Sequence, residues 1–120
     1  MSEPTGKKRW LKQRRSERIK LTVPVFVHRP AKEGPHFSER THTLNISAHG
    51  ALMSLTGLVA VRQRLLLQNL ASGEQQECSV VSVEANPMGP TKVAVEFARP
   101  APSFWRIAYP PPDWNAASLV

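Results

Sequence analysis

The residues near the N-terminus that are best suited to binding chemistry are three arginines. The run Arg-Arg-Ser-Glu-Arg contains Arg14, Arg15 and Arg18, so that its first and last arginines stand four positions apart. An arginine carries a rigid planar guanidinium that bonds two phosphate oxygens at once. The same group matches the adjacent O6 and N7 acceptors of guanine, and its flat face stacks on a base. The spacing therefore favours an anionic ligand that carries a base.

A second group of binding residues follows about thirty positions later, in the run Asn-Ile-Ser-Ala-His-Gly. Asn45 offers an amide that can hold the edge of a base, and Ser47 offers a hydroxyl that can donate to a phosphate or a carbonyl. Gly50 lets a ligand approach backbone N–H groups closely, or it satisfies a positive φ angle. Asn and Ser also cap their own backbone at turns, so ordinary turn chemistry explains this run as well. Together with the arginines, these residues could bind a guanine nucleotide with exposed phosphates.

The charge of the chain points to the same kind of partner. The 120 residues include 16 Lys and Arg against 9 Asp and Glu, which gives a formal net charge of +7. The first twenty residues carry +6 of this charge, and the remaining hundred carry +1. The basicity therefore belongs to an N-terminal arm, and it predicts an anionic partner: nucleic acid, a nucleotide or acidic lipid headgroups.

Residues for catalysis or metal binding are sparse. Asp113 is the only aspartate, and the single cysteine, Cys78, lies in an apolar run where a thiol is usually inert. No strained Gly-x-Ser-x-Gly turn is present, so we expect no enzyme activity and no cofactor. The four histidines are irregularly spaced, with no cysteine nearby, and are interpreted as surface or turn residues rather than metal ligands: His28, His36, His42 and His49.

The elements that must position these residues are short strands. In the first strand, over 21–28, every second residue is apolar (Leu21, Val23, Val25 and Val27), and Pro24 within it predicts a sheet edge. Residues 29–38 form a loop with two prolines and a glycine. Five more runs follow, at 40–46, 50–55, 63–70, 78–85 and 92–98. Six short strands joined by Gly, Pro and Asn turns predict an all-β fold, a small antiparallel barrel or sandwich.

The runs after the first differ in how clearly they alternate. In the fifth run Val81 and Val83 alternate with Ser82 and Glu84, which predicts one apolar face.

The sequence contains no apolar run near the roughly 20 residues that a membrane-spanning helix needs. No apolar stretch of the secretory kind follows the basic start, so a cytoplasmic location is expected.

The two ends of the chain are expected to differ from the strands. Residues 1–12 have no sustained period and predict a flexible basic arm, in which Trp10 has no assigned role. Residues 102–107 predict a helical turn, in which Phe104 and Trp105 close one end of the barrel. Residues 109–120 form a proline-rich tail, and its three consecutive prolines are expected to prevent regular structure. The domain itself is therefore placed at residues 13–108.

The two motifs, in this order and spacing, resemble those of the PilZ domain. The Arg-x-x-x-Arg element precedes the first strand, and the Asn-x-Ser-x-x-Gly element follows about thirty residues later. The start of the run at 50–55, the end of the run at 92–98 and the Phe-Trp-Arg-Ile segment at 104–107 are also similar. The resemblance covers residues 13–108 and implies a six-stranded antiparallel barrel that binds the bacterial second messenger cyclic di-GMP.

The resemblance also implies roles for particular residues. Arg14 and Arg18 would grip guanine and phosphate as the arm folds over the barrel, with Arg15 as an auxiliary. The rim that contacts the rest of the ligand would be formed by three residues of the second motif: Asn45, Ser47 and Gly50. An aspartate at position 45 would accept two guanine N–H bonds with charge assistance, whereas the amide has one acceptor oxygen. We therefore expect binding, with weaker guanine recognition than an aspartate would give.

Two other functions are compatible with the same residues. A small basic barrel could bind nucleic acid with its arm along the phosphates, although the charge of only +1 outside the arm disfavours this. A PilZ-like barrel that binds no ligand could act as an adaptor. In the leading hypothesis, cyclic di-GMP orders the arm and thereby changes the surface offered to a partner protein.

Overall fold

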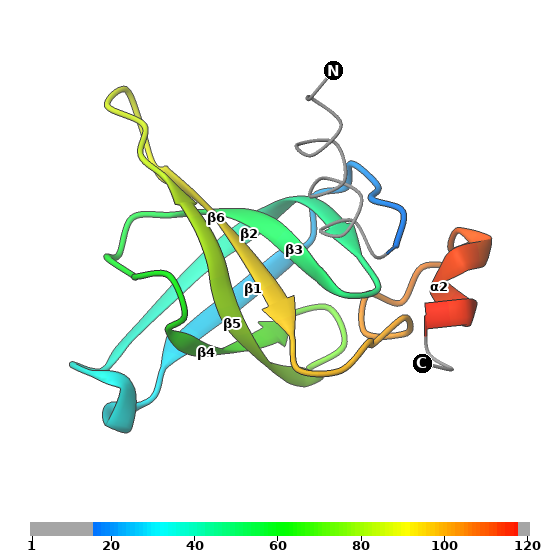
Figure 1. The fold of residues 1–120 in the computed structure, drawn as a ribbon, viewed down its shortest axis with the longest axis horizontal. Helices are drawn as coiled ribbons and strands as arrows, with labels where there is room; N and C mark the ends of the chain where they lie inside the picture. Colours follow the sequence, from blue (N-terminus) through cyan, green and yellow to red (C-terminus); the bar gives the residue numbers. More distant parts are fainter. Residues whose placement is uncertain (1–15, 118–120) are drawn as a thin grey trace, which may run out of the picture.

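Six runs of alternating residues form the strands of a closed antiparallel barrel in the computed structural model, which describes residues 16–117 (Figure 1). The strands are β1 (Pro24–Arg29), β2 (Phe37–Ser47), β3 (Gly50–Leu55), β4 (Arg64–Asn69), β5 (Gln75–Glu84) and β6 (Thr91–Phe97). Around the barrel they follow the order β1-β2-β3-β6-β5-β4, and β4 pairs with β1 to close it. This architecture confirms the all-β, six-stranded barrel.

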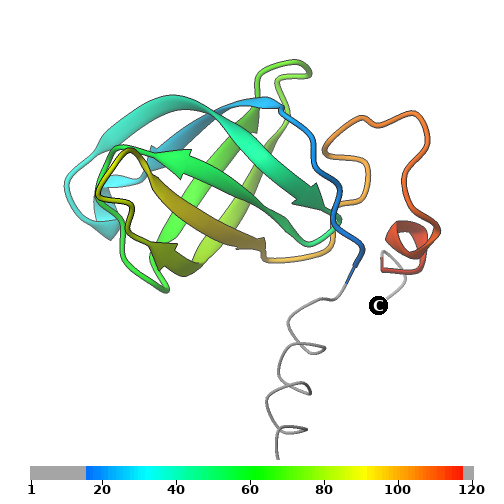
Figure 2. The same ribbon diagram turned by 90° about the horizontal axis from the view of Figure 1, so that it is seen from above.

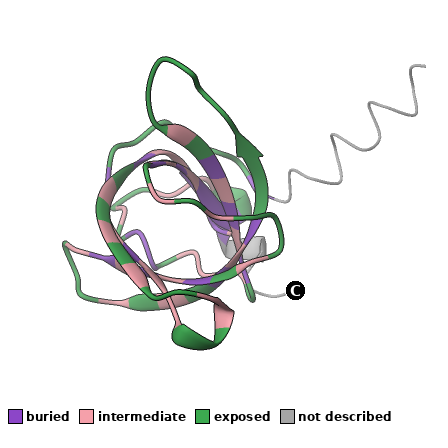
Figure 3. Cartoon of the chain, turned by 90° about the vertical axis from the view of Figure 1, so that its left-hand side faces the viewer, coloured by how far each residue is buried: buried purple, intermediate pink, exposed green. Residues whose placement is uncertain are grey.

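The inside of the barrel is filled by the apolar side chains that alternate along the strands. Val25, Val27, Met53, Leu55 and Leu67 have no exposed surface. Figure 3 shows the barrel from one end, with buried and more exposed positions alternating along its wall. Because successive side chains of a strand point to opposite faces, burying these residues turns the intervening ones outward. The outer faces of β2, β3, β5 and β6 are therefore available to build a site.

Two details of the strands differ from the sequence-based expectation. Pro24 was expected at a sheet edge, but β1 pairs with both β2 and β4. Proline is tolerated there because it is the first residue of the strand. In β5, the register shifts between Val80 and Ser82, so that Val81 and Val83 are 48% and 38% exposed instead of forming an apolar inner face. The extra residue of a bulge resets the alternation of a strand.

The segment after β6 closes one end of the barrel, as expected. Phe104 and Trp105 are each 3% exposed, and their ring centroids lie 4.8 Å apart in an edge-to-face arrangement. Residues 102–105 form hydrogen-bonded turns, in which the Phe104 N–H donates to the Ala101 carbonyl. The helix lies further on, as α2 (Pro112–Ala117), so the expected absence of regular structure after the prolines is wrong. Proline fits the first position of a helix, because its missing N–H has no partner there in any case.

The start of the described chain runs beside α2. Figures 1 and 2 show the segment from residue 16 to β1 passing α2 at the same end of the barrel. The predicted arm, residues 1–12, lies outside the described residues, and Trp10 with it. Within residues 16–117, no helix is long and apolar enough to cross a membrane.

Candidate functional site

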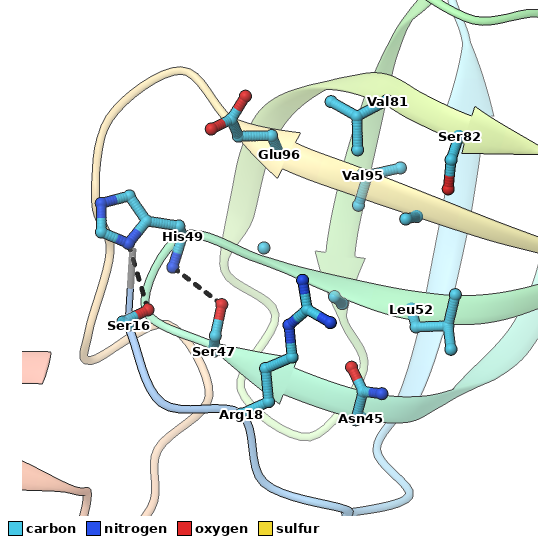
Figure 4. A pocket seen from close by; sticks show the side chains of 13 residues that line it. Ser16, Arg18, Asn45, Ser47, His49, Leu52, Val81, Ser82, Val95 and Glu96 are labelled. Atoms are coloured by element: carbon cyan, nitrogen blue, oxygen red, sulfur yellow. Dashed lines mark hydrogen bonds between the residues drawn. The ribbon is translucent and has the colours of Figure 1, made fainter. Parts of the chain in front are cut away.

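A groove of about 490 Å³ lies on the outer wall of the barrel, where it is lined by β2, β3, β6 and β5 and by the segment before β1 (Figure 4). Its floor is partly apolar, with Leu52 from β3, Val81 from β5 and Ala94 from β6. Polar side chains stand around this floor: Arg18, Asn45, Ser47, Ser82 and Glu96. An apolar floor with a few converging polar groups is the usual form of a small-molecule site.

Asn45 and Ser47 face the groove because the residue between them faces the core. Ile46 has no exposed surface, and strand alternation then turns its two neighbours outward. The register between β2 and β3 shifts between Thr43 and Asn45, which sets this alternation for the end of β2. The β5 bulge at Val81 lies across the same groove. Bulges of this kind re-aim side chains and are common next to binding sites.

The turn between β2 and β3 is held by hydrogen bonds from the end of β6 and from the segment that follows β6. Three successive carbonyls, of Ser47, Ala48 and His49, each accept a hydrogen bond. The donors are the Trp105 indole Nε1–H at 2.9 Å, the Ala101 N–H at 2.7 Å and the Phe97 N–H at 2.7 Å, respectively. On the other side of the turn, the His49 N–H donates to the Ser47 hydroxyl at 3.2 Å. The motif turn is therefore rigid before any ligand contacts it.

Gly50 is required by the spacing of two strands and not by an unusual backbone angle. Its φ is not positive; of the glycines within residues 16–117, only Gly34 and Gly73 adopt positive φ, so that interpretation is wrong. A Cβ atom at Gly50 would lie 2.0 Å from the backbone oxygen of Val95 in β6. Such a distance is far inside van der Waals contact, so only glycine fits at this crossing.

The segment carrying Arg18 is fixed to the barrel directly after that residue. Ile19 forms an isolated bridge with Ile46, in which both N–H···O=C distances are 2.9 Å. Further on, the buried hydroxyl of Thr43 donates to the Leu21 carbonyl and accepts from the Val23 N–H. The Arg18 side chain extends over the strands, with Ser47 on one side and Asn45 on the other (Figure 4).

The sequence-predicted residues are thus partly brought together. Arg18, Asn45, Ser47 and Gly50 line the same groove. Arg14 and Arg15 lie outside the described residues, so their positions stay predictions.

Several lining residues were missed by sequence reasoning. Ser16 is 3% exposed, and its hydroxyl lies 3.1 Å from Nδ1 of His49, a residue interpreted above as an ordinary turn histidine. Ser16 lies inside the first motif and His49 inside the second, and these positions are the sequence signal that could have identified them. Ser82 and Glu96 reach the groove only through the pairing of β3 with β6 and β6 with β5, which no local pattern reveals.

Outside the groove, the described residues include neither a candidate metal site nor a reactive thiol. No set of three or more His, Cys, Asp or Glu side chains within residues 16–117 could hold a metal ion. Burial raises the pKa of the Cys78 thiol to about 12, so it stays protonated at neutral pH. The chemistry available is that of binding: guanidinium donors for phosphate or for O6 and N7 of guanine, amide and hydroxyl groups for a base edge, and an apolar floor.

Comparisons with known proteins agree with this architecture. No curated protein has a significantly similar sequence. Among solved structures, the fold is similar to that of the Bacillus subtilis inhibitor of motility (MotI/DgrA), with a TM-score of 0.59 and 22% sequence identity. The match covers 88% of this chain and 48% of that one, so the chain spans about half the length of that protein. The family model of the PilZ domain matches residues 12–103, and on this match, over well more than half of its length, the chain belongs to the PilZ domain family.

Proposed function

We propose that the groove binds cyclic di-GMP and that the chain acts as a receptor for this messenger. PilZ domains are generally cyclic di-GMP receptors and are binding domains rather than enzymes. The observation that carries the proposal for this chain is that the two motifs meet in one groove. Arg18 is far in sequence from the motif residues Asn45, Ser47 and Gly50, yet all four line one groove whose floor is partly apolar.

In this proposal each residue has a distinct role. Arg18, together with Arg14 and Arg15, bonds phosphate oxygens and the O6 and N7 atoms of one guanine. Asn45 and the Ser47 hydroxyl bond the ligand on the opposite rim. Gly50 contributes indirectly, because it lets β3 approach β6 closely enough to form the wall of the groove.

The output is proposed to pass through a partner protein. The structural neighbour is named as an inhibitor of motility, and an inhibitory adaptor is one form that such an output could take. Residues 16–20 are held against the barrel by contacts within the chain, so ordering by the ligand would concern the residues before them. We place this function in the cytoplasm, as expected for a receptor of an intracellular nucleotide.

Isothermal titration calorimetry tests the proposal. We expect the full chain to bind cyclic di-GMP, with no comparable response to cyclic di-AMP or GMP. Arg18→Ala should lower the affinity at least about 10-fold, because a charge-assisted contact is worth about 1.5–3 kcal/mol. The matched control is Arg40→Ala, which removes an exposed arginine of β2 outside the groove.

The outcomes separate the proposal from its alternatives. Equal heats for all three ligands, or equal effects of the two arginine variants, would refute specific recognition in this groove. Absence of binding by the wild type would favour an adaptor that needs no ligand. A mobility shift of nucleic acid at modest salt, without cyclic di-GMP binding, would favour the basic-barrel alternative.

A further inference from the structure

The C-terminal helix α2 contacts Glu17, a residue of the Arg-x-x-x-Arg element. The two residues of α2 that make the contact are 96 and 97 positions away from Glu17 in the sequence. The Glu17 N–H donates to Oδ2 of Asp113 at 2.9 Å. The Glu17 carbonyl accepts from the indole Nε1–H of Trp114 at 2.8 Å. Both backbone polar groups of one residue are thus bonded to two adjacent side chains of α2, and Glu17 directly precedes Arg18.

Trp114 is anchored in the core, so its hydrogen bond holds the Glu17 backbone in place. Its side chain has no exposed surface and belongs to the hydrophobic core, although it lies outside the barrel strands. A fully buried indole cannot follow a mobile segment, because moving it would expose its whole apolar surface. The Glu17 backbone is therefore held by the core through Trp114, and not only by surface contacts.

The neighbouring contacts leave Arg18 between two fixed residues. On one side, Glu17 is bonded to α2; on the other, Ile19 bridges to Ile46 in β2. Within residues 16–18, the other hydrogen bond that ties the chain to the barrel is the one between Ser16 and His49 described above. The course of the backbone that enters Arg18 is consequently set by the C-terminal helix.

We propose that Asp113 and Trp114 are positioning residues of the binding site, which hold the backbone at Arg18 over the groove before the ligand binds. This inference rests on the proposed function for its ligand, but its structural half can be tested without one. A site whose side chains are ordered in advance loses less conformational entropy on binding and so binds more tightly. The two residues touch the Glu17 backbone and line no part of the groove.

Two variants remove the two contacts separately. Trp114→Phe keeps an aromatic ring in the core but lacks the indole donor. Asp113→Ala removes the acceptor at an exposed position, so it leaves the core intact if the tryptophan variant fails to fold. The matched control is Tyr109→Phe, which alters an aromatic residue of the same segment that is 92% exposed.

The first measurement is amide hydrogen exchange of the full chain without ligand. We expect the Glu17 and Ile19 amides to exchange about 3- to 10-fold faster in both contact variants, which is the range that the loss of one hydrogen bond gives. The Val80 amide, bonded to the Gln63 carbonyl within the barrel, is the internal reference and should keep its rate in Asp113→Ala. Unchanged exchange at Glu17 and Ile19 would overturn the inference, whatever the ligand does.

The second measurement is the affinity for cyclic di-GMP by calorimetry. We expect a 3- to 10-fold loss in Asp113→Ala and Trp114→Phe, and no change in Tyr109→Phe. Faster exchange with unchanged affinity would overturn the positioning role. If the wild type itself does not bind cyclic di-GMP, the proposed function fails, and the exchange data alone then decide whether α2 orders the backbone on either side of Arg18.

Discussion

Replacing Gly50 with alanine tests whether the glycine of the second motif serves the ligand or the barrel. The Cβ atom of alanine would lie 2.0 Å from the Val95 oxygen, 3.0 Å from the Val95 carbonyl carbon and 3.1 Å from Cα of Glu96. All three are backbone atoms of β6, which cannot rotate away as a side chain could. The two strands would have to separate by on the order of 1 Å at this point, next to the pair formed by Gly50 and Glu96.

The expected cost follows from the nature of this contact. Overpacking a close-packed region costs about 1–3 kcal/mol, and a clash with backbone belongs in the upper half of that range. We therefore expect Gly50→Ala to lower the free energy of unfolding by about 2–3 kcal/mol. For a domain of this size, that corresponds to a fall in Tm of about 8–15 °C.

Thermal and urea unfolding of the protein without ligand measure this cost, and two other glycines provide the comparison. At Gly89 the nearest atom to a new Cβ is 3.5 Å away, so Gly89→Ala should change stability by less than about 0.5 kcal/mol. Gly73 has φ +81° and open space around it, so Gly73→Ala reports the cost of the backbone angle alone. If Gly50→Ala is as stable as Gly89→Ala, the spacing argument is wrong, and the glycine must act through the ligand.

Three further predictions concern two side chains, Asn45 and Cys78. Asn45→Asp should raise the affinity for cyclic di-GMP several-fold in calorimetry, because a carboxylate accepts two guanine N–H bonds with charge assistance; an unchanged or lower affinity would contradict this role. The Cys78 thiol should react with Ellman's reagent at pH 8 only after unfolding, because its pKa is raised to about 12 by burial. Since the folded-state pKa of Cys78 lies above the unfolded value, its contribution to stability is complete below about pH 9 and is lost as the pH rises towards 12; a Cys78→Ala variant should lack this part of the alkaline destabilisation.

The alternation of apolar residues predicted the strands well, because each strand buries one face in a single core. The strand β3 has the bounds expected from its sequence, and the hairpin that joins it to β2 is local. The facing of Val81 and Val83 was not predictable in the same way. A bulge is fixed by the partner strand, and neither glycine nor proline marks this one in the sequence.

The site residues also fall into two groups, those placed by local structure and those placed by pairing between distant strands. Asn45, Ser47 and Gly50 belong to one hairpin, so their proximity could be read from the sequence, whereas the order in which β3, β6 and β5 join could not. Pairing between strands far apart in sequence supplies the opposite wall of the groove, including Ser82 and Glu96. The role of α2 is not visible in the sequence for a different reason, since three consecutive prolines, the last of them Pro112 at the start of α2, predict an absence of regular structure.

The segment after β6 is the part of the chain that joins the two halves of the site. Trp105 bonds the Ser47 carbonyl under the motif turn, and Trp114 bonds the Glu17 carbonyl beside Arg18. Both indoles are buried, so neither contact can shift without disturbing the core. The distance between the arginine element and the turn is therefore set by this segment as well as by the barrel. A partner that displaced α2 would act on the arginine side of the groove and leave the turn in place.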